Sequence, residues 1–117
     1  MPDAPQCVIV GGGMITQVQL LPTIYHLQRI GLVGEISVCA LDAPPLRALQ
    51  ESEAFATGFP GQSFTPYPDP AKAGDGEKFP ELYKEVIQAL PPQQVVVVAV
   101  PDQLHYETIK FALEYDQ

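Results

Sequence analysis

A run of three glycines, Gly11–Gly13, follows a short apolar segment, Cys7–Val10, near the start of the chain. The mostly β-branched, wholly apolar segment predicts a strand buried on both faces. A glycine turn between a first strand and a first helix is where dinucleotide-binding folds hold a pyrophosphate. Gly11 would permit the tight turn, and Gly13 would let the phosphates approach the backbone. Thr16 replaces the third glycine of the G-x-G-x-x-G pattern, so two of its three glycines are present.

The next residues, Met14 and Ile15, are predicted to open the first helix. The first N–H groups of a helix have no partners within it, and the helix dipole adds a partial positive charge, so this end attracts an anion. Gly11, Gly13, Met14 and Ile15 are therefore candidate cofactor-binding residues. The alternative is a glycine-rich turn that binds no ligand.

Asp42 follows a second predicted strand, Glu35–Leu41. A carboxylate there can accept hydrogen bonds from the adenosine ribose and repel a 2′-phosphate, which favours NAD over NADP. Asp42 lies 31 residues after Gly11, against roughly 20 in the compact pattern, and a longer first helix would absorb the difference. Asp42 could equally be the N-cap of the next helix. Arg47, one turn into that helix, could bind the 2′-phosphate of NADP or be an exposed, solubilising side chain.

A third candidate group, Val100, Pro101, Asp102 and His105, follows the last predicted strand. This is the edge of the sheet where such folds bind their ligands. Asp102 could instead cap the last helix, and His105 could pack in its first turn, because a lone histidine is more often structural than catalytic. We expect no metal site or acyl-transfer site, since metal-ligand spacing, a G-x-S-x-G elbow and a P-loop lysine are all missing from the sequence.

The composition restricts the class of protein. The chain has 117 residues, enough for one domain, and 46% hydrophobic against 17% charged residues excludes disorder. Six basic and 14 acidic residues give a net charge of −8 without a basic cluster, so neither nucleic acid nor a membrane is expected as a partner. Two cysteines, Cys7 and Cys39, without a secretory signal predict free thiols and a cytoplasmic protein.

Strand and helix patterns alternate along the chain. Strands are predicted over Cys7–Val10, Glu35–Leu41, Ser63–Tyr67 (a short edge strand) and Gln94–Val100, and helices over Met14–Ile30 (bent at Pro22), from Asp42 to about Phe55, and over Phe79–Leu90 and Asp102–Tyr115. This order predicts an α/β fold, a Rossmann-like, doubly wound parallel sheet of about four strands with helices on both faces. Residues 1–117 would form one dinucleotide-binding domain with an incomplete sheet, whose open edge predicts either self-association or only marginal stability.

Taken together, the glycine turn, an early Leu-Leu-Pro in the first helix, Asp42 after the second strand and the Val100–His105 stretch resemble the N-terminal domain of the Gfo/Idh/MocA family of NAD(P)-dependent oxidoreductases. In that family the last stretch commonly reads T-P-N-x-x-H. This chain matches at the proline and the histidine, and has Val for Thr and Asp for Asn. The resemblance covers nearly the whole chain.

The resemblance implies a two-domain enzyme, in which a C-terminal domain binds a sugar, inositol or related polyol and often builds a homo-oligomer. The family's catalytic lysine lies in a Glu-Lys-Pro motif after the next strand, beyond Gln117; the similar string Glu77–Pro80 precedes the fourth strand and does not correspond. We therefore expect the NAD-binding, or alternatively NADP-binding, domain of an oxidoreductase that transfers hydride to or from such a substrate, inactive alone and without a catalytic residue of its own. The alternative is a non-catalytic nucleotide-sensing or scaffold module.

Overall fold

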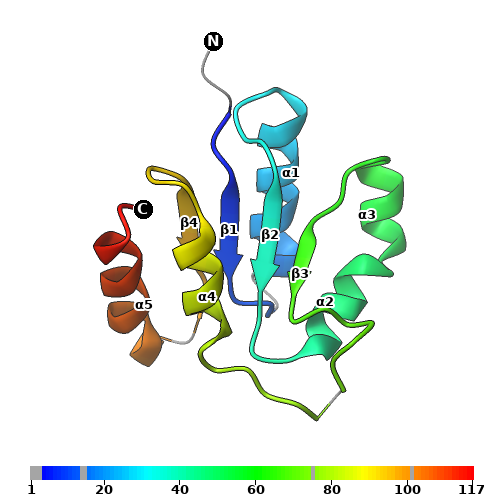
Figure 1. The fold of residues 1–117 in the computed structure, drawn as a ribbon. Coiled ribbons are helices and arrows are strands. Elements are labelled where there is room, and N and C mark those ends of the chain that lie inside the picture. The colour runs from blue at the N-terminus through cyan, green and yellow to red at the C-terminus, as the bar shows by residue number, and fades with distance from the viewer. Residues whose placement is uncertain (1–3, 14–15, 75, 101) are drawn as a thin grey trace.

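Strands and helices alternate from end to end in the computed structural model, which describes residues 4–13, 16–74, 76–100 and 102–117 (Figure 1). The elements are β1 (Cys7–Val10), a π-helical turn (Thr16–Leu20), α1 (Leu21–Arg29), β2 (Ile36–Cys39), α2 (Ala43–Gln50), α3 (Glu53–Gly58), β3 (Thr65–Tyr67), α4 (Leu82–Ala89), β4 (Val95–Val98) and α5 (Asp102–Glu114). All four predicted strands are present, and β2, β3 and β4 are shorter than predicted.

The four strands form one parallel sheet in the order β3-β2-β1-β4. In register, Cys7 of β1 pairs with Ile36 of β2 and with Val95 of β4. The chain first adds strands on one side of β1 and then crosses to the other side, which makes the carboxyl ends of β1 and β4 a topological switch point. The predicted α/β, Rossmann-like fold with an incomplete parallel sheet is confirmed.

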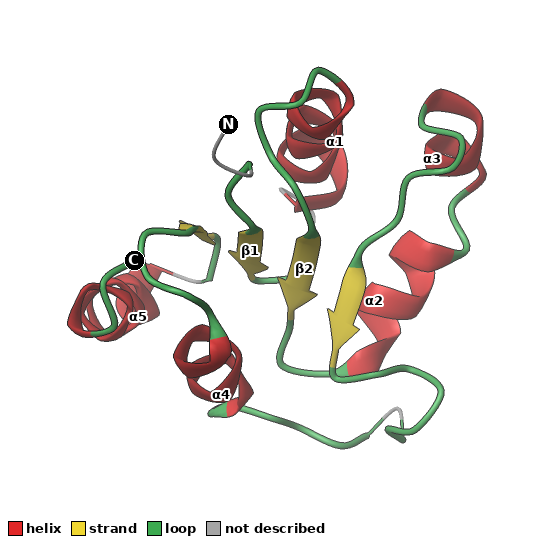
Figure 2. Ribbon diagram, turned by 45° about the horizontal axis from the view of Figure 1, so that its top comes forward, coloured by secondary structure: helices red, strands yellow, loops and turns green. Residues whose placement is uncertain are grey.

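Helices cover both faces of the sheet (Figure 2). On one face, α1, α2 and α3 pack with inward side chains of the strands such as Ile9 and Val38. On the other face, α4 and α5 pack with Val8 and Val10. Successive strand residues point to opposite faces, so β1 needs apolar side chains at every position, and all four are buried.

The first predicted helix differs in form. Instead of one bent helix over Met14–Ile30, the described chain has the π-helical turn followed by α1. The helical backbone runs without a gap from Thr16 to Arg29, with Leu20 at φ −72° and ψ −53°, and Pro22 lies where the π-helical turn gives way to α1, which is where the predicted helix was expected to be irregular. Met14 and Ile15 lie outside the described residues.

The second predicted helix is in fact two helices, so the prediction of one helix to Phe55 was wrong. α2 ends at Gln50, and α3 begins after Ser52, whose side chain accepts a hydrogen bond from the Phe55 backbone N–H at 3.4 Å. A serine that caps a helix satisfies an N–H group that has no partner inside it. The break turns α3 toward the amino end of β3 (Figure 1).

One side of the sheet keeps a large apolar surface. β4 is an edge strand, and Val95 at its start is exposed. Next to it, α5 exposes four apolar side chains, those of Leu104, Tyr106, Ile109 and Leu113. This α5 apolar surface and the β4 edge are where the predicted self-association would take place.

Candidate functional site

A cavity of 580 Å³ lies at the carboxyl ends of β1, β2 and β4. Its walls are the glycine turn Gly11–Gly13, the ends of β2 and β4, the segment Phe79–Glu81 before α4, and one face of α5. The volume falls within the range of about 300–1,000 Å³ that small-molecule sites occupy. Its position at the switch point is the one where open α/β sheets bind ligands.

The structural requirement for glycine differs among the three positions of the turn. Gly11 has a φ of +126°, and a Cβ there would lie 2.4 Å from the carbonyl oxygen of Ala99. A Cβ on Gly12 would lie 2.9 Å from the Cβ of Ala40. A Cβ on Gly13 would meet no atom of the described residues within 4 Å. Packing within the protein therefore accounts for the first two glycines, whereas Gly13 leaves open space at the cavity wall.

Thr16, at the position of the missing third glycine, is fully buried. Its Oγ1 donates a hydrogen bond to the carbonyl oxygen of Gly11 at 2.7 Å, and the Gly11 backbone N–H donates to the Cys39 carbonyl oxygen at 2.6 Å. In the sequence Thr16 appears only as a departure from the glycine pattern. In the structure the threonine holds the glycine turn from the helix side, while β2 holds it from the sheet side.

Asp42 stands at the N-cap position of α2, but its side chain caps no N–H group. Its carboxylate instead accepts a hydrogen bond from Lys78 Nζ at 2.5 Å, an ion pair in which the Asp42 side chain is 19% exposed and that of Lys78 56%. Arg47 donates to the carbonyl oxygen of Pro70 at 3.2 Å and is not among the residues that line the cavity. The predicted ribose-binding carboxylate is thus close to the end of β2, but it is already paired, and neither Asp42 nor Lys78 is among the residues that line the cavity.

The segment that carries Lys78 is a part of the site that the sequence does not indicate. The Phe79 backbone N–H donates to the Leu41 carbonyl oxygen at 2.7 Å, which fastens this loop across the end of β2. The Phe79 and Pro80 side chains then form one wall of the cavity. In the sequence, residues Glu77–Pro80 only resemble a Glu-Lys-Pro motif at the wrong place in the chain. No local pattern relates Lys78 to Asp42, which lies 36 residues earlier.

On the opposite side of the cavity, Val100 is a lining residue and His105 is not. His105 Nε2 lies 2.6 Å from the Val100 carbonyl oxygen, so the imidazole ties the first turn of α5 to the segment after β4. This contact favours the structural alternative for the histidine. Pro101 lies outside the described residues, and Asp102 begins α5.

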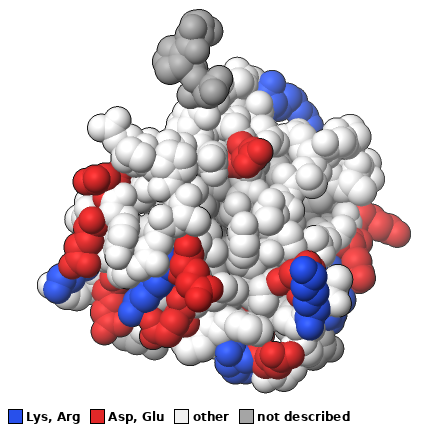
Figure 3. Space-filling model, in the orientation of Figure 1, with Lys and Arg blue, Asp and Glu red and all other residues white. Residues whose placement is uncertain are grey.

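The cavity holds two acidic side chains, Glu81 and Glu107, and Lys84 forms an ion pair with Glu81 at 2.6 Å. On the face in Figure 3, acidic and basic side chains lie intermixed on the lower half of the molecule and form no basic patch. Cys39 at the end of β2 also lines the cavity, and burial raises the pKa of its thiol to about 12, which keeps the thiol neutral and unreactive. An anion would therefore find its favourable contacts at the glycine turn rather than at side chains.

Other kinds of site are missing from the part of the chain that the structure describes. No three His, Cys, Asp or Glu side chains there could hold a metal ion, and none of its helices is long and apolar enough to span a membrane. Cys7 and Cys39 are free and lie on neighbouring strands, as predicted. Comparisons with protein-family models, curated proteins and solved structures find no match to this chain.

Proposed function

We propose that this protein binds a nicotinamide dinucleotide in the cavity at the carboxyl ends of the strands, as the cofactor-binding part of an oxidoreductase. The observation that carries the proposal is the open space at Gly13, next to a turn that packing holds in place through Gly11. Exposed backbone at a switch-point glycine turn lets a pyrophosphate approach closely. Volume and position of the cavity fit the same interpretation.

Two parts of the cavity, together with the Asp42–Lys78 pair that lies outside its lining, would serve three parts of the ligand. The pyrophosphate would lie against the glycine turn, with Met14 and Ile15 contributing N–H groups. The adenosine ribose would lie toward Asp42 and Lys78, and the nicotinamide toward Val100. The Lys78 ammonium balances the Asp42 charge, so the site would accept NAD and would not exclude the 2′-phosphate of NADP.

The resemblance supports hydride transfer to or from a sugar, inositol or related polyol held by a further domain. Turnover needs a proton-transfer group beside the nicotinamide. His105 does not supply one, because its Nε2 is in contact with the Val100 backbone carbonyl oxygen. We therefore expect the chain alone to bind the dinucleotide without oxidising a polyol. Two free, buried thiols are in keeping with the reducing cytoplasm as its location.

Calorimetric titration with NAD and with NADP tests the proposal. Saturable binding that Gly13→Ala weakens supports it, and Gly58→Ala is the matched control, because a Cβ there also meets nothing within 4 Å but lies on α3, away from the cavity. The proposal would be contradicted if neither NAD nor NADP bound to the protein. It would also be contradicted if Gly13→Ala and Gly58→Ala weakened dinucleotide binding equally.

A second candidate is a nucleotide-sensing or scaffold module that makes no use of a nicotinamide ring. The acidic Glu81 and Glu107 in the cavity favour its scaffold form, because they disfavour every anionic ligand, a mononucleotide as well as NAD. Absence of binding by NAD, NADP and a mononucleotide such as AMP in the same titration would support the scaffold, and binding of AMP as tight as that of NAD would support nucleotide sensing.

A further inference from the structure

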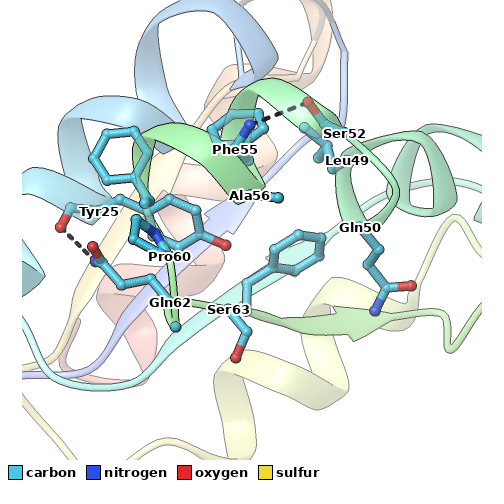
Figure 4. A pocket seen from close by; sticks show the side chains of 12 residues that line it. Tyr25, Leu49, Gln50, Ser52, Phe55, Ala56, Pro60, Gln62 and Ser63 are labelled. Atoms are coloured by element: carbon cyan, nitrogen blue, oxygen red, sulfur yellow. Dashed lines mark hydrogen bonds between the residues drawn. The ribbon is translucent and has the colours of Figure 1, made fainter.

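A second cavity, of 450 Å³, lies at the amino end of β3, on the opposite edge of the sheet from the glycine turn (Figure 4). Tyr25 of α1, the end of α2, the helix α3 and the loop 59–64 line it. No residue of the proposed dinucleotide site lines it. Its occupant would therefore be independent of the proposed cofactor.

Aromatic rings form much of its wall. The ring centroids of Tyr25 and Phe55 lie 5.7 Å apart in an edge-to-face arrangement, and those of Tyr25 and Phe59 lie 5.3 Å apart. Phe64, which is buried, contributes a further ring. Such rings offer flat apolar surface and favour edge-to-face or offset contact with another ring.

Hydrogen bonds hold the outer wall in place. Arg29 donates to the Gly58 carbonyl oxygen at 2.7 Å, and its guanidinium carbon lies 4.8 Å from the centroid of the Phe59 ring. Gln62 Nε2 donates to the Tyr25 carbonyl oxygen at 2.7 Å, which fixes the loop to α1. The cavity is thus preformed, and a ligand would not have to order its walls.

Among the described residues that line the cavity, Tyr25 is the most buried one whose polar side-chain group forms no hydrogen bond. The residue is only 3% exposed, yet its phenol oxygen points into the cavity (Figure 4). Among the residues that the structure describes, no atom forms a hydrogen bond with this hydroxyl, and because no fully buried polar side-chain atom there lacks a partner, the hydroxyl oxygen is accessible from the cavity. Burial raises the pKa of Tyr25 to about 12, so the hydroxyl keeps its proton at neutral pH and is available as a donor.

All of the lining side chains are uncharged. A charged ligand would lose its hydration without gaining a counter-charge, which is unfavourable in a half-buried site. An aromatic ligand would gain contact with the rings, and an acceptor atom on it would complete the hydrogen bonding of Tyr25. We propose that this cavity binds a compact, uncharged aromatic molecule whose carbonyl oxygen accepts a hydrogen bond from the Tyr25 hydroxyl.

The test uses 6-propionyl-2-(dimethylamino)naphthalene, an uncharged fluorescent aromatic ketone, titrated with the full chain. The chain has no tryptophan, so background emission is low. We expect saturable binding that Tyr25→Phe weakens roughly 2- to 10-fold, the usual effect of losing one neutral hydrogen bond. Tyr25→Phe removes a group without a protein partner, so the variant should fold, which circular dichroism verifies.

Two further variants locate the binding. Ala56→Leu adds bulk at the cavity wall and should also weaken binding. Tyr106→Phe, at a tyrosine that is 74% exposed on α5, is the matched control and should leave the affinity unchanged. Non-saturable binding to the wild type, unchanged affinity of Tyr25→Phe, or unchanged affinity of Ala56→Leu would each overturn the proposal.

Discussion

Replacing Gly11 by alanine should destabilise the fold strongly, because two costs add at this position. A φ of +126° is a conformation that L side chains rarely adopt, and holding alanine there costs about 1–3 kcal/mol. The new Cβ would also lie 2.4 Å from the oxygen and 2.7 Å from the carbon of the Ala99 carbonyl group. To relieve this steric clash, β1 and the chain after β4 would have to move apart. Overpacking of this kind costs about 1–3 kcal/mol.

The sum, about 2–6 kcal/mol, is a large part of the roughly 5–15 kcal/mol that stabilises a domain of this kind. Urea unfolding followed by circular dichroism should show a much lower midpoint with an unchanged slope, and the melting temperature should fall by about 10 °C or more. Gly58→Ala, where a Cβ meets nothing, should change stability by no more than about 1 kcal/mol.

Gly13→Ala completes the comparison, because it separates folding from binding. With nothing within 4 Å of the new Cβ, stability should stay the same or rise by about 0.4–1 kcal/mol. Affinity for NAD should fall roughly 10-fold or more if the methyl group displaces the phosphates from the backbone. A Gly11→Ala midpoint equal to that of the wild type refutes the steric argument, and undiminished NAD binding by Gly13→Ala refutes the role of that glycine.

Three other outcomes follow from the same structure. Asp42→Ala should weaken NAD binding and improve NADP binding, since it frees the Lys78 ammonium for the 2′-phosphate, and Lys78→Met should do the reverse; equal shifts for both dinucleotides in calorimetry would contradict this. Burial raises the pKa of Cys7 to about 11 and that of Cys39 to about 12, so the unfolded thiols ionise first and the urea midpoint should fall as the pH rises from 9 toward 12; a Cys39→Ala variant should show a smaller fall. Sedimentation should show self-association that Leu113→Lys reduces, and a monodisperse wild-type monomer would be evidence against the predicted role of the β4 edge and α5.

The elements that the sequence predicts well are those whose signal is local. A run such as Cys7–Val10 needs only its own β-branched residues to indicate a strand, and the strand has the predicted bounds. The break after Gln50 was missed although its signal is local: residues 50–53 are all polar, and Ser52 is a residue type that favours the N-cap position. The direction that α3 then takes depends on a tertiary arrangement, in which Phe55 packs against Tyr25 of a different helix.

The candidate site divides in the same way. The glycine turn is predictable because its residues are consecutive and need only the neighbouring strand and helix. That packing requires a glycine at position 11 cannot be seen in the local sequence, because the neighbouring atoms belong to Ala99, which follows β4 far along the chain. The wall formed by Phe79 has no sequence signal either, because it arises where a long loop crosses the end of β2.

The Asp42–Lys78 pair shows why an acidic residue after the second strand does not by itself determine the cofactor. As a free carboxylate, Asp42 would repel a 2′-phosphate. With an ammonium group 2.5 Å away, the two charges largely cancel at the distance of a bound ribose. Discrimination would then depend on which partner the ribose displaces. The 2′-hydroxyl of NAD would compete with Lys78 for the Asp42 carboxylate. The 2′-phosphate of NADP would compete with the Asp42 carboxylate for Lys78. The phosphate carries more negative charge than the carboxylate, so the second competition is the more favourable one for the ligand.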